Sequence, residues 1–203
     1  MQINLHSIPA YRLNEYSLIL NPHEELRQRI QQVKNQFGET YKTEMAAGMK
    51  PHIALARFSQ WEMMEERIVN RLKVVAMGFQ PFKVELQDFG SYPSHTLFIK
   101  VATRLPIQNL VRAIRGSQRF MKPDSEHKPH FIDDPHITIA RKLAPWQYEK
   151  GWMKYSHRHF TGRFIANSML LLKRRMGDKA WQIARRFEFM NLPVTTKQGE
   201  LFV

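Results

Sequence analysis

The sequence predicts an α+β fold in which two pseudo-symmetric lobes of mainly antiparallel sheet and helices surround a central cleft. The first observation is a repeated phrase: PHIALAR at 51–57 returns as PHITIAR at 135–141, an offset of 84 residues. The second is that this offset also matches three pairs outside the phrase: Pro22 with Pro106, Leu26 with Leu110, and Ile30 with Ile114. The third is that the order strand, helix, strand, helix occurs in both halves. Together they indicate an internal duplication.

The first half, about 15–78, begins with EYSLIL, whose side chains predict a strand over 15–20. Asn21 and Pro22 predict a helix start, because asparagine caps helices and proline fits the first helical position. Gly38 is expected to end this helix, which is lined at helical spacing by Leu26, Ile30, Val33 and Phe37.

A loop over 38–50 then leads to the first histidine strand, 51–58. Ser59 and Glu62 match a capping box, which predicts a second helix ending at Gly78.

The second half, about 95–156, repeats this order. A strand over 95–101 precedes a helix lined by Ile107, Leu110, Val111 and Ile114, and a polar loop over 120–134 precedes the second histidine strand, 135–142. Pro145 opens a helix that runs to about Ser156. Further strands are expected at 81–89, 162–175 and 180–190. We expect one bilobed domain over 1–190 and a loose tail over 191–203.

The composition points to a polyanionic partner. Lys and Arg number 31 against 18 Asp and Glu, a formal net charge of +13, which favours a partner such as RNA, DNA, a nucleotide or an acidic membrane surface, although a protein can also be basic without such a partner. The chain has no cysteine, which excludes thiol nucleophiles and suits a reducing cytoplasm. No signal peptide and no apolar run of about 18 residues occurs, so we expect a cytoplasmic protein without a membrane partner. For the oligomeric state we favour a monomer.

The repeated phrase carries the candidate chemistry. Alternate side chains of a strand share a face, so His136 and Thr138 point one way, as do His52 and Ala54. Two histidines at one cleft suit acid–base catalysis on a phosphodiester: a neutral imidazole accepts a proton while a protonated one donates to the leaving oxygen. The Thr138 hydroxyl can donate to a phosphate oxygen. This chemistry needs neither a metal nor another cofactor.

Two alternatives attach to the histidines. A histidine in a strand is often structural, and this alternative weakens because both histidines stand in duplicated contexts. A metal site is the other, since His127 with His130 and His157 with His159 have spacings that a metal can use. No acidic pattern accompanies those pairs, so exposed loop histidines are the simpler interpretation.

Two H-x-[TS]-x-like motifs about 80 residues apart in a basic two-lobed chain resemble the 2H phosphoesterase superfamily, and within it the 2′-5′ RNA ligase-like, or RNA 2′,3′-cyclic phosphodiesterase, branch. The likeness extends over about 15–190. The segments that carry it are HIAL, HITIAR, FGSYPSHTLFIKV at 89–101, MLLLKRR and WQIARRFEF.

This resemblance implies a two-lobed fold around a cleft, with His52 and His136 as the acid–base pair and Thr138 and Arg141 as phosphate ligands. It also implies metal-independent opening of 2′,3′-cyclic phosphates to 2′-phosphates, and in some members the joining of 2′-5′ RNA linkages. The family usually has threonine or serine where this chain has Ala54. Losing one charge-assisted hydrogen bond costs about 1.5–3 kcal/mol, which water, a backbone amide or a nearby Lys or Arg can offset.

Arg57 and Arg141 are the exception to the expected geometry. Both stand an odd number of residues after their histidines, so strict alternation points them away from the cleft, unless a bulge or strand end intervenes.

The leading interpretation is a phosphodiesterase acting on RNA ends or nucleotides. The second is a catalytically weakened RNA- or nucleotide-binding module on the same fold, which Ala54 and the charge of +13 would suit. The third is a structural or interaction protein. Glycine-rich phosphate loops with a following lysine and nucleophile elbows do not occur in the sequence.

Overall fold

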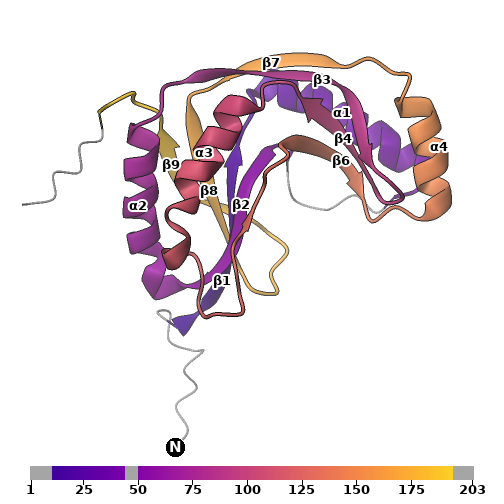
Figure 1. Cartoon of the computed structure of the whole chain (residues 1–203). Coiled ribbons are helices and arrows are strands. Elements are labelled where there is room, and N and C mark those ends of the chain that lie inside the picture. The colour runs from indigo at the N-terminus through magenta and orange to yellow at the C-terminus, as the bar shows by residue number, and fades with distance from the viewer. Residues whose placement is uncertain (1–10, 44–49, 194–203) are drawn as a thin grey trace, which may run out of the picture.

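The computed structural model describes residues 11–43 and 50–193 of the chain (Figure 1). Its strands form two antiparallel sheets. Sheet A has the order β5-β2-β1-β8-β9. Its strands are β1 (Leu13–Leu20), β2 (Ile53–Trp61), β5 (His130–Phe131), β8 (Ser168–Arg175) and β9 (Gln182–Glu188).

Sheet B has the order β6-β4-β3-β7. Its strands are β3 (Phe82–Tyr92), β4 (Thr96–Val101), β6 (His136–Arg141) and β7 (Thr161–Ala166). The run β2-β1-β8-β9 of sheet A therefore corresponds, strand for strand, to β6-β4-β3-β7 of sheet B. This correspondence confirms the predicted α+β architecture with two similar lobes.

The helices cover the two sheets in a crossed arrangement. α1 (Glu24–Tyr41) and α4 (Pro145–Tyr155) pack on sheet B, whereas α2 (Glu65–Met77) and α3 (Leu105–Arg115) pack on sheet A, as Figure 1 shows. Each sheet is thus covered by one helix from each sequence half. The two halves interlock, because α1 crosses from its neighbours β1 and β2 to the opposite lobe.

The main core lies between the sheets and these helices. From α1 it receives Leu26, Ile30, Phe37 and Tyr41, all at most 6% exposed. The prediction that Gly38 ends α1 is wrong: the helix continues to Tyr41, whose buried ring packs at a tilt against Phe37 with ring centroids 4.6 Å apart. The cap is also not Asn21: the His23 imidazole accepts the bond from the Leu26 amide at 3.3 Å.

Two other boundaries differ from the sequence prediction. Ser59 does not cap a helix, because β2 stays paired with β1 as far as Trp61, and the 3₁₀ turn η3 (Glu62–Met64) precedes α2. The strand expected over 162–175 is two strands, since the chain passes from sheet B to sheet A at Asn167.

The loop expected over 120–134 contains β5, and the 3₁₀ turn η4 (Gln118–Phe120) borders it. Gly78 is the C-terminal cap of α2, as predicted. The tail was expected from residue 191, and its part after residue 193 lies outside the described residues. No helix in the described ranges has the length and apolar character that crossing a bilayer requires.

Candidate active site

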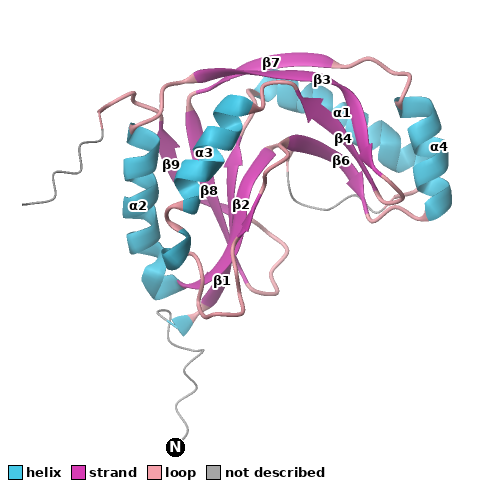
Figure 2. Cartoon of the chain, viewed as in Figure 1, coloured by secondary structure: helices cyan, strands magenta, loops and turns pink. Residues whose placement is uncertain are grey.

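The two candidate histidines stand at the starts of two strands that meet. His52 lies directly before β2, and His136 is the first residue of β6. β2 and β6 are in contact where the two sheets come together, as Figure 2 shows. The repeated phrases of the sequence therefore lie side by side at the junction of the lobes.

Both histidines are oriented by the same backbone contact. His52 Nδ1 lies 2.7 Å from the carbonyl oxygen of Lys50, and His136 Nδ1 lies 2.8 Å from that of Asp134. A carbonyl oxygen can only accept, so Nδ1 carries the proton in each ring. The neutral form of each histidine therefore has its lone pair on Nε2, the atom available for proton transfer.

His136 sits in a small aromatic box. Its ring centroid is 4.7 Å from that of Phe98 and 5.4 Å from that of Tyr92. The Tyr92 hydroxyl donates to Asp134 Oδ2 at 2.8 Å, and burial together with this carboxylate raises the pKa of Tyr92 to about 12. Arg104 forms an ion pair with the Asp134 side chain at 3.5 Å. This ion pair helps to hold in place the residue whose backbone carbonyl orients His136.

Two β-bulges change which side chains face the histidines. In the pairing of β1 with β2, Leu18 opposes Ala56 and Ile19 opposes Ala54, so Leu55 is the extra residue. A bulge shifts the alternation of side chains by one position. Arg57 is therefore on the same face of β2 as Ala54, and it is exposed.

The second bulge repeats the first. Leu97 of β4 opposes Ala140 and Phe98 opposes Thr138, which leaves Ile139 as the extra residue, 84 positions after Leu55. Arg141 therefore joins Thr138 on the His136 face. The expectation from strict alternation, that both arginines point away from the cleft, is wrong for this physical reason.

A cluster of cations surrounds His52. Burial first, and then the positive charges of Arg57, Lys34 and Arg141, lower the pKa of His52 to about 4, although the hydrogen bond to its backbone carbonyl partner acts in the opposite direction. Partial burial and then Arg141 lower the pKa of Lys34, and the same two causes lower that of Arg57, whose side chain is buried in part although much of its surface stays exposed. Cations that depress one another's pKa are brought closer than their charges favour, and a bound anion would relieve this repulsion.

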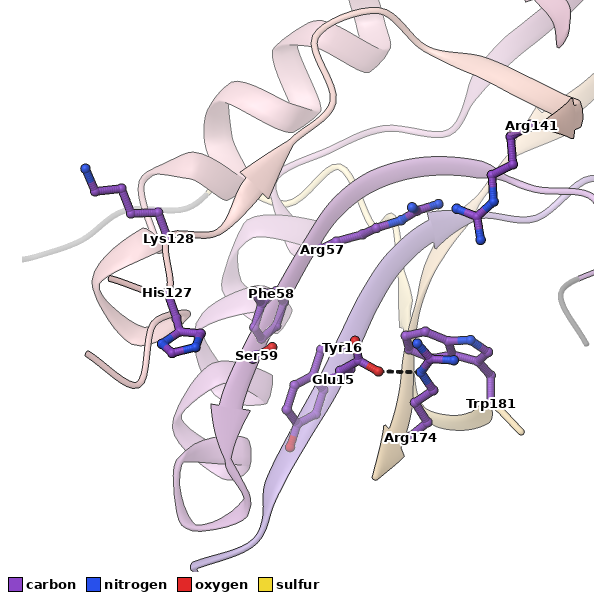
Figure 3. A pocket seen from close by; sticks show the side chains of 10 residues that line it. All are labelled: Glu15, Tyr16, Arg57, Phe58, Ser59, His127, Lys128, Arg141, Arg174 and Trp181. Atoms are coloured by element: carbon purple, nitrogen blue, oxygen red, sulfur yellow. Dashed lines mark hydrogen bonds and ion pairs between the residues drawn. The ribbon is translucent and has the colours of Figure 1, made fainter. Parts of the chain in front are cut away.

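A pocket of about 330 Å³ adjoins the histidine strands (Figure 3). Arg57 and Arg141 extend toward one another at one side of it, and Arg174 with Trp181 lies below them. The other lining residues are Glu15, Tyr16, Phe58, Ser59, His127 and Lys128. His52, His136, Ala54 and Thr138 are not part of this lining, so the pocket extends the candidate site rather than containing it.

Sequence reasoning missed three of these side chains. Lys34 comes from α1, and its approach to His52 requires the crossed packing of the helices. Arg174 is one of three consecutive basic residues, 173–175, and nothing in the sequence singles it out. Alternation along β8 places its side chain on the opposite face of the sheet from Lys173, which pairs with Glu65 at 2.7 Å. For Trp181 the sequence offered only its position at the start of a predicted strand, and no pattern that indicated a binding role.

The histidine pairs considered for metal binding have other contacts. His127 Nδ1 lies 2.7 Å from Asp124, and His159 Nδ1 lies 3.3 Å from Asp88. Within residues 11–43 and 50–193, no group of three or more His, Asp or Glu side chains has an arrangement suited to a metal ion.

Residues 22–178 match the family model of the 2′-5′ RNA ligase superfamily. The chain belongs to the 2′-5′ RNA ligase superfamily. A protein of Geobacillus kaustophilus named "Putative phosphoesterase" is 26% identical over 137 residues, 66% of this chain and 73% of the relative. A protein of the same description from Bacillus pumilus is 23% identical over 133 residues, 64% of this chain and 71% of the relative. The names of both relatives support the interpretation that this chain is a phosphoesterase.

Solved structures of other proteins share the fold. Escherichia coli LigT superimposes with a TM-score of 0.60 at 13% identity, over 87% of this chain and 98% of LigT. TT0787 of Thermus thermophilus does so with a TM-score of 0.60 at 18% identity, over the same shares of the two chains.

Proposed function

We propose that this superfamily member is a metal-independent phosphodiesterase that opens 2′,3′-cyclic phosphates of RNA ends or nucleotides to 2′-phosphates. The observation that carries the proposal is the duplicated arrangement of a histidine at the start of each of β2 and β6 and an arginine that the bulge of that strand turns to the same side. In the proposal, these two imidazoles and two guanidinium groups act on one phosphate.

In the proposed reaction, a neutral histidine takes a proton from water, whose oxygen attacks phosphorus. The bond from phosphorus to O3′ breaks, and O3′ receives a proton from the other, protonated histidine. The product is a 2′-phosphate with a free 3′-hydroxyl. When the 5′-hydroxyl of a second RNA takes the place of water, it gives its proton to the neutral histidine and attacks phosphorus, the bond to O3′ breaks, and O3′ again receives a proton from the protonated histidine. The product is a 2′-5′ linkage, so ligation by the same pair is part of the proposal.

Phosphate binding is assigned to Thr138, Arg141, Arg57 and Lys34. Arg57 and Lys34 stand near His52, on the side of the site where Ala54 lacks a hydroxyl. A guanidinium or ammonium donor can stabilise the charge that a threonine hydroxyl would otherwise hold. We therefore expect Ala54 to be compatible with turnover.

The nucleotide character of the substrate has support from charge and from a relative. The net charge of +13 favours a polyanion. Escherichia coli LigT, which shares the fold, has been solved in complex with 3′-AMP. The lack of cysteine supports a cytoplasmic place of action, and we propose a monomer, since one chain supplies both histidines.

The second candidate function is an RNA- or nucleotide-binding module without turnover. Ala54 and the low pKa of His52, about 4, favour it, because the protonated form of His52 is scarce at neutral pH in the free protein. Salt-sensitive RNA binding without product would identify this function.

The test is incubation in excess EDTA with a short RNA ending in a 2′,3′-cyclic phosphate. We expect a 2′-phosphate product with the wild type, and its loss in both His52→Ala and His136→Ala. His157→Ala, an exposed histidine after α4, is the matched control and should retain the wild-type rate. Turnover that survives both site substitutions would overturn the two-histidine mechanism.

A further inference from the structure

We propose that Arg174 and Trp181 form a nucleobase-binding subsite. The inference rests on the proposed function and narrows its substrate class: the substrate is a nucleotide or an RNA end, with a base that stacks on this pair, rather than a small cyclic phosphodiester without a base.

Trp181 is held by apolar neighbours on sheet A. It directly precedes β9 and packs against Ile19, Leu170 and Leu172, which are 5%, 8% and 9% exposed. These three side chains form a cluster separate from the main core. The indole is thus fixed on one side by packing, while part of it remains accessible and lines the pocket.

Arg174 is held against Trp181 by a carboxylate. Its guanidinium carbon lies 4.6 Å from the centre of the indole ring, and its Nε donates to Glu15 Oε2 at 2.5 Å. Both partners of this ion pair are only about a third exposed, at 29% and 31%. Contacts from the indole and the carboxylate together restrict the guanidinium plane, so the planar group is presented in one orientation.

The subsite lies beside the proposed phosphate-binding arginines. Arg57, Arg141, Arg174 and Trp181 line one pocket, and Figure 3 shows the last two directly below the first two. The charge of Arg174 also contributes to lowering the pKa of Arg57, which is evidence of their proximity. A phosphate held by Arg57 and Arg141 would therefore bring its attached nucleoside to this pair.

The chemistry of the pair matches a nucleobase. Bases of single-stranded nucleic acids stack on aromatic rings and on arginine guanidinium planes, and this stacking depends little on base identity. Lys128 at the other side of the pocket adds a cation suited to a neighbouring phosphate. A substrate without a base would leave the Arg174–Trp181 pair unused.

The experiment compares two substrates in steady-state kinetics: adenosine 2′,3′-cyclic phosphate, and the cyclic phosphate of methyl riboside, which lacks the base. We expect Trp181→Ala to lower the ratio of their kcat/KM values by roughly 5- to 150-fold, the range for loss of one stacked base. Trp181→Phe should restore most of the ratio. Trp146→Ala, an exposed tryptophan on α4, should leave it unchanged. An equal effect of Trp181→Ala on both substrates, or none, would overturn the subsite.

Binding separates this proposal from the proposed function. In the His52→Ala, His136→Ala double variant, calorimetry with adenosine 2′-monophosphate and with inorganic phosphate requires no turnover. Weaker binding of the nucleotide but not of phosphate on adding Trp181→Ala supports the subsite even for a protein without phosphodiesterase activity. Turnover in the wild type combined with Trp181-independent nucleotide binding rejects the subsite and leaves the enzyme standing. Thermal unfolding of each variant verifies that it is folded.

Discussion

The low pKa of His52 predicts a measurable loss of stability in weak acid. Burial and the nearby cations hold this pKa at about 4 in the folded protein, against 6.5 for a free histidine. Between these two pH values the unfolded chain binds a proton that the folded chain does not. The free energy of unfolding contributed by neutral His52 is therefore fully present above pH 6.5 and is lost as the pH falls towards 4.

The size of the effect follows from the same two values. At about 1.36 kcal/mol per pH unit, the interval from 6.5 to 4 corresponds to about 3 kcal/mol, a large part of the roughly 5–15 kcal/mol by which domains are stable. We expect urea unfolding of the wild type to show this loss, and His52→Gln, which cannot titrate, to lack it. Carboxylates titrate in both proteins, so the difference between them isolates His52.

His157→Gln is the control for removal of a histidine as such, and it should follow the wild type. Inorganic phosphate bound at the cation cluster should raise the pKa of His52, which the imidazole NMR signals report directly. If the wild type and His52→Gln lose stability in parallel between pH 6.5 and 4, the burial and charge argument for His52 is refuted.

Three further predictions concern the site and the packing around it. Ala54→Thr should raise kcat/KM for a cyclic phosphate by about tenfold at most, because cations already stand beside the missing hydroxyl; a decrease would show that the methyl group is needed. Arg141→Ala should lower kcat/KM by roughly 10- to 150-fold and weaken its salt dependence, whereas Arg163→Ala, on the exposed side of β7, should do neither. Gly151→Ala should destabilise the fold by about 1–3 kcal/mol in urea unfolding, because the added Cβ would lie 2.8 Å from the ring of Phe37; an unchanged midpoint would mean that α4 shifts freely.

Several elements of the fold were predictable because their signals are local or repeated. The 84-residue offset is enough to relate β2 to β6, and turn and periodicity signals located α2 and its end at Gly78. Asn167 shows the limit of such signals. The run from 162 to 175 has apolar residues on both sides of Asn167 and Ser168, and this turn-favouring pair does not tell whether a strand bends within one sheet or passes from sheet B to sheet A.

The candidate site divides in the same way. The residue types and spacing of the two phrases nominated His52, His136 and Thr138, and the family resemblance added Arg141; all four remain proposals for the reaction. Strict alternation alone gives the wrong orientation for Arg141, and the bulge allowed for as an exception is present. The sequence could not locate it, because a bulge arises from pairing with a neighbouring strand and has no reliable mark in its own strand.

The sequence by itself determined that this protein has a duplicated histidine strand, an α+β fold and a strong positive charge, since each of these is encoded in residue identity and local spacing. The tertiary structure decided what those strands present. Strand pairing introduced the bulges that turn both arginines toward the histidine faces. The crossed packing of helices brought Lys34 to His52, and the hairpin of β8 and β9 brought Trp181 against Arg174. These contacts depend on how the strands and helices pair and pack, so their energies belong to the assembled fold and not to any single segment.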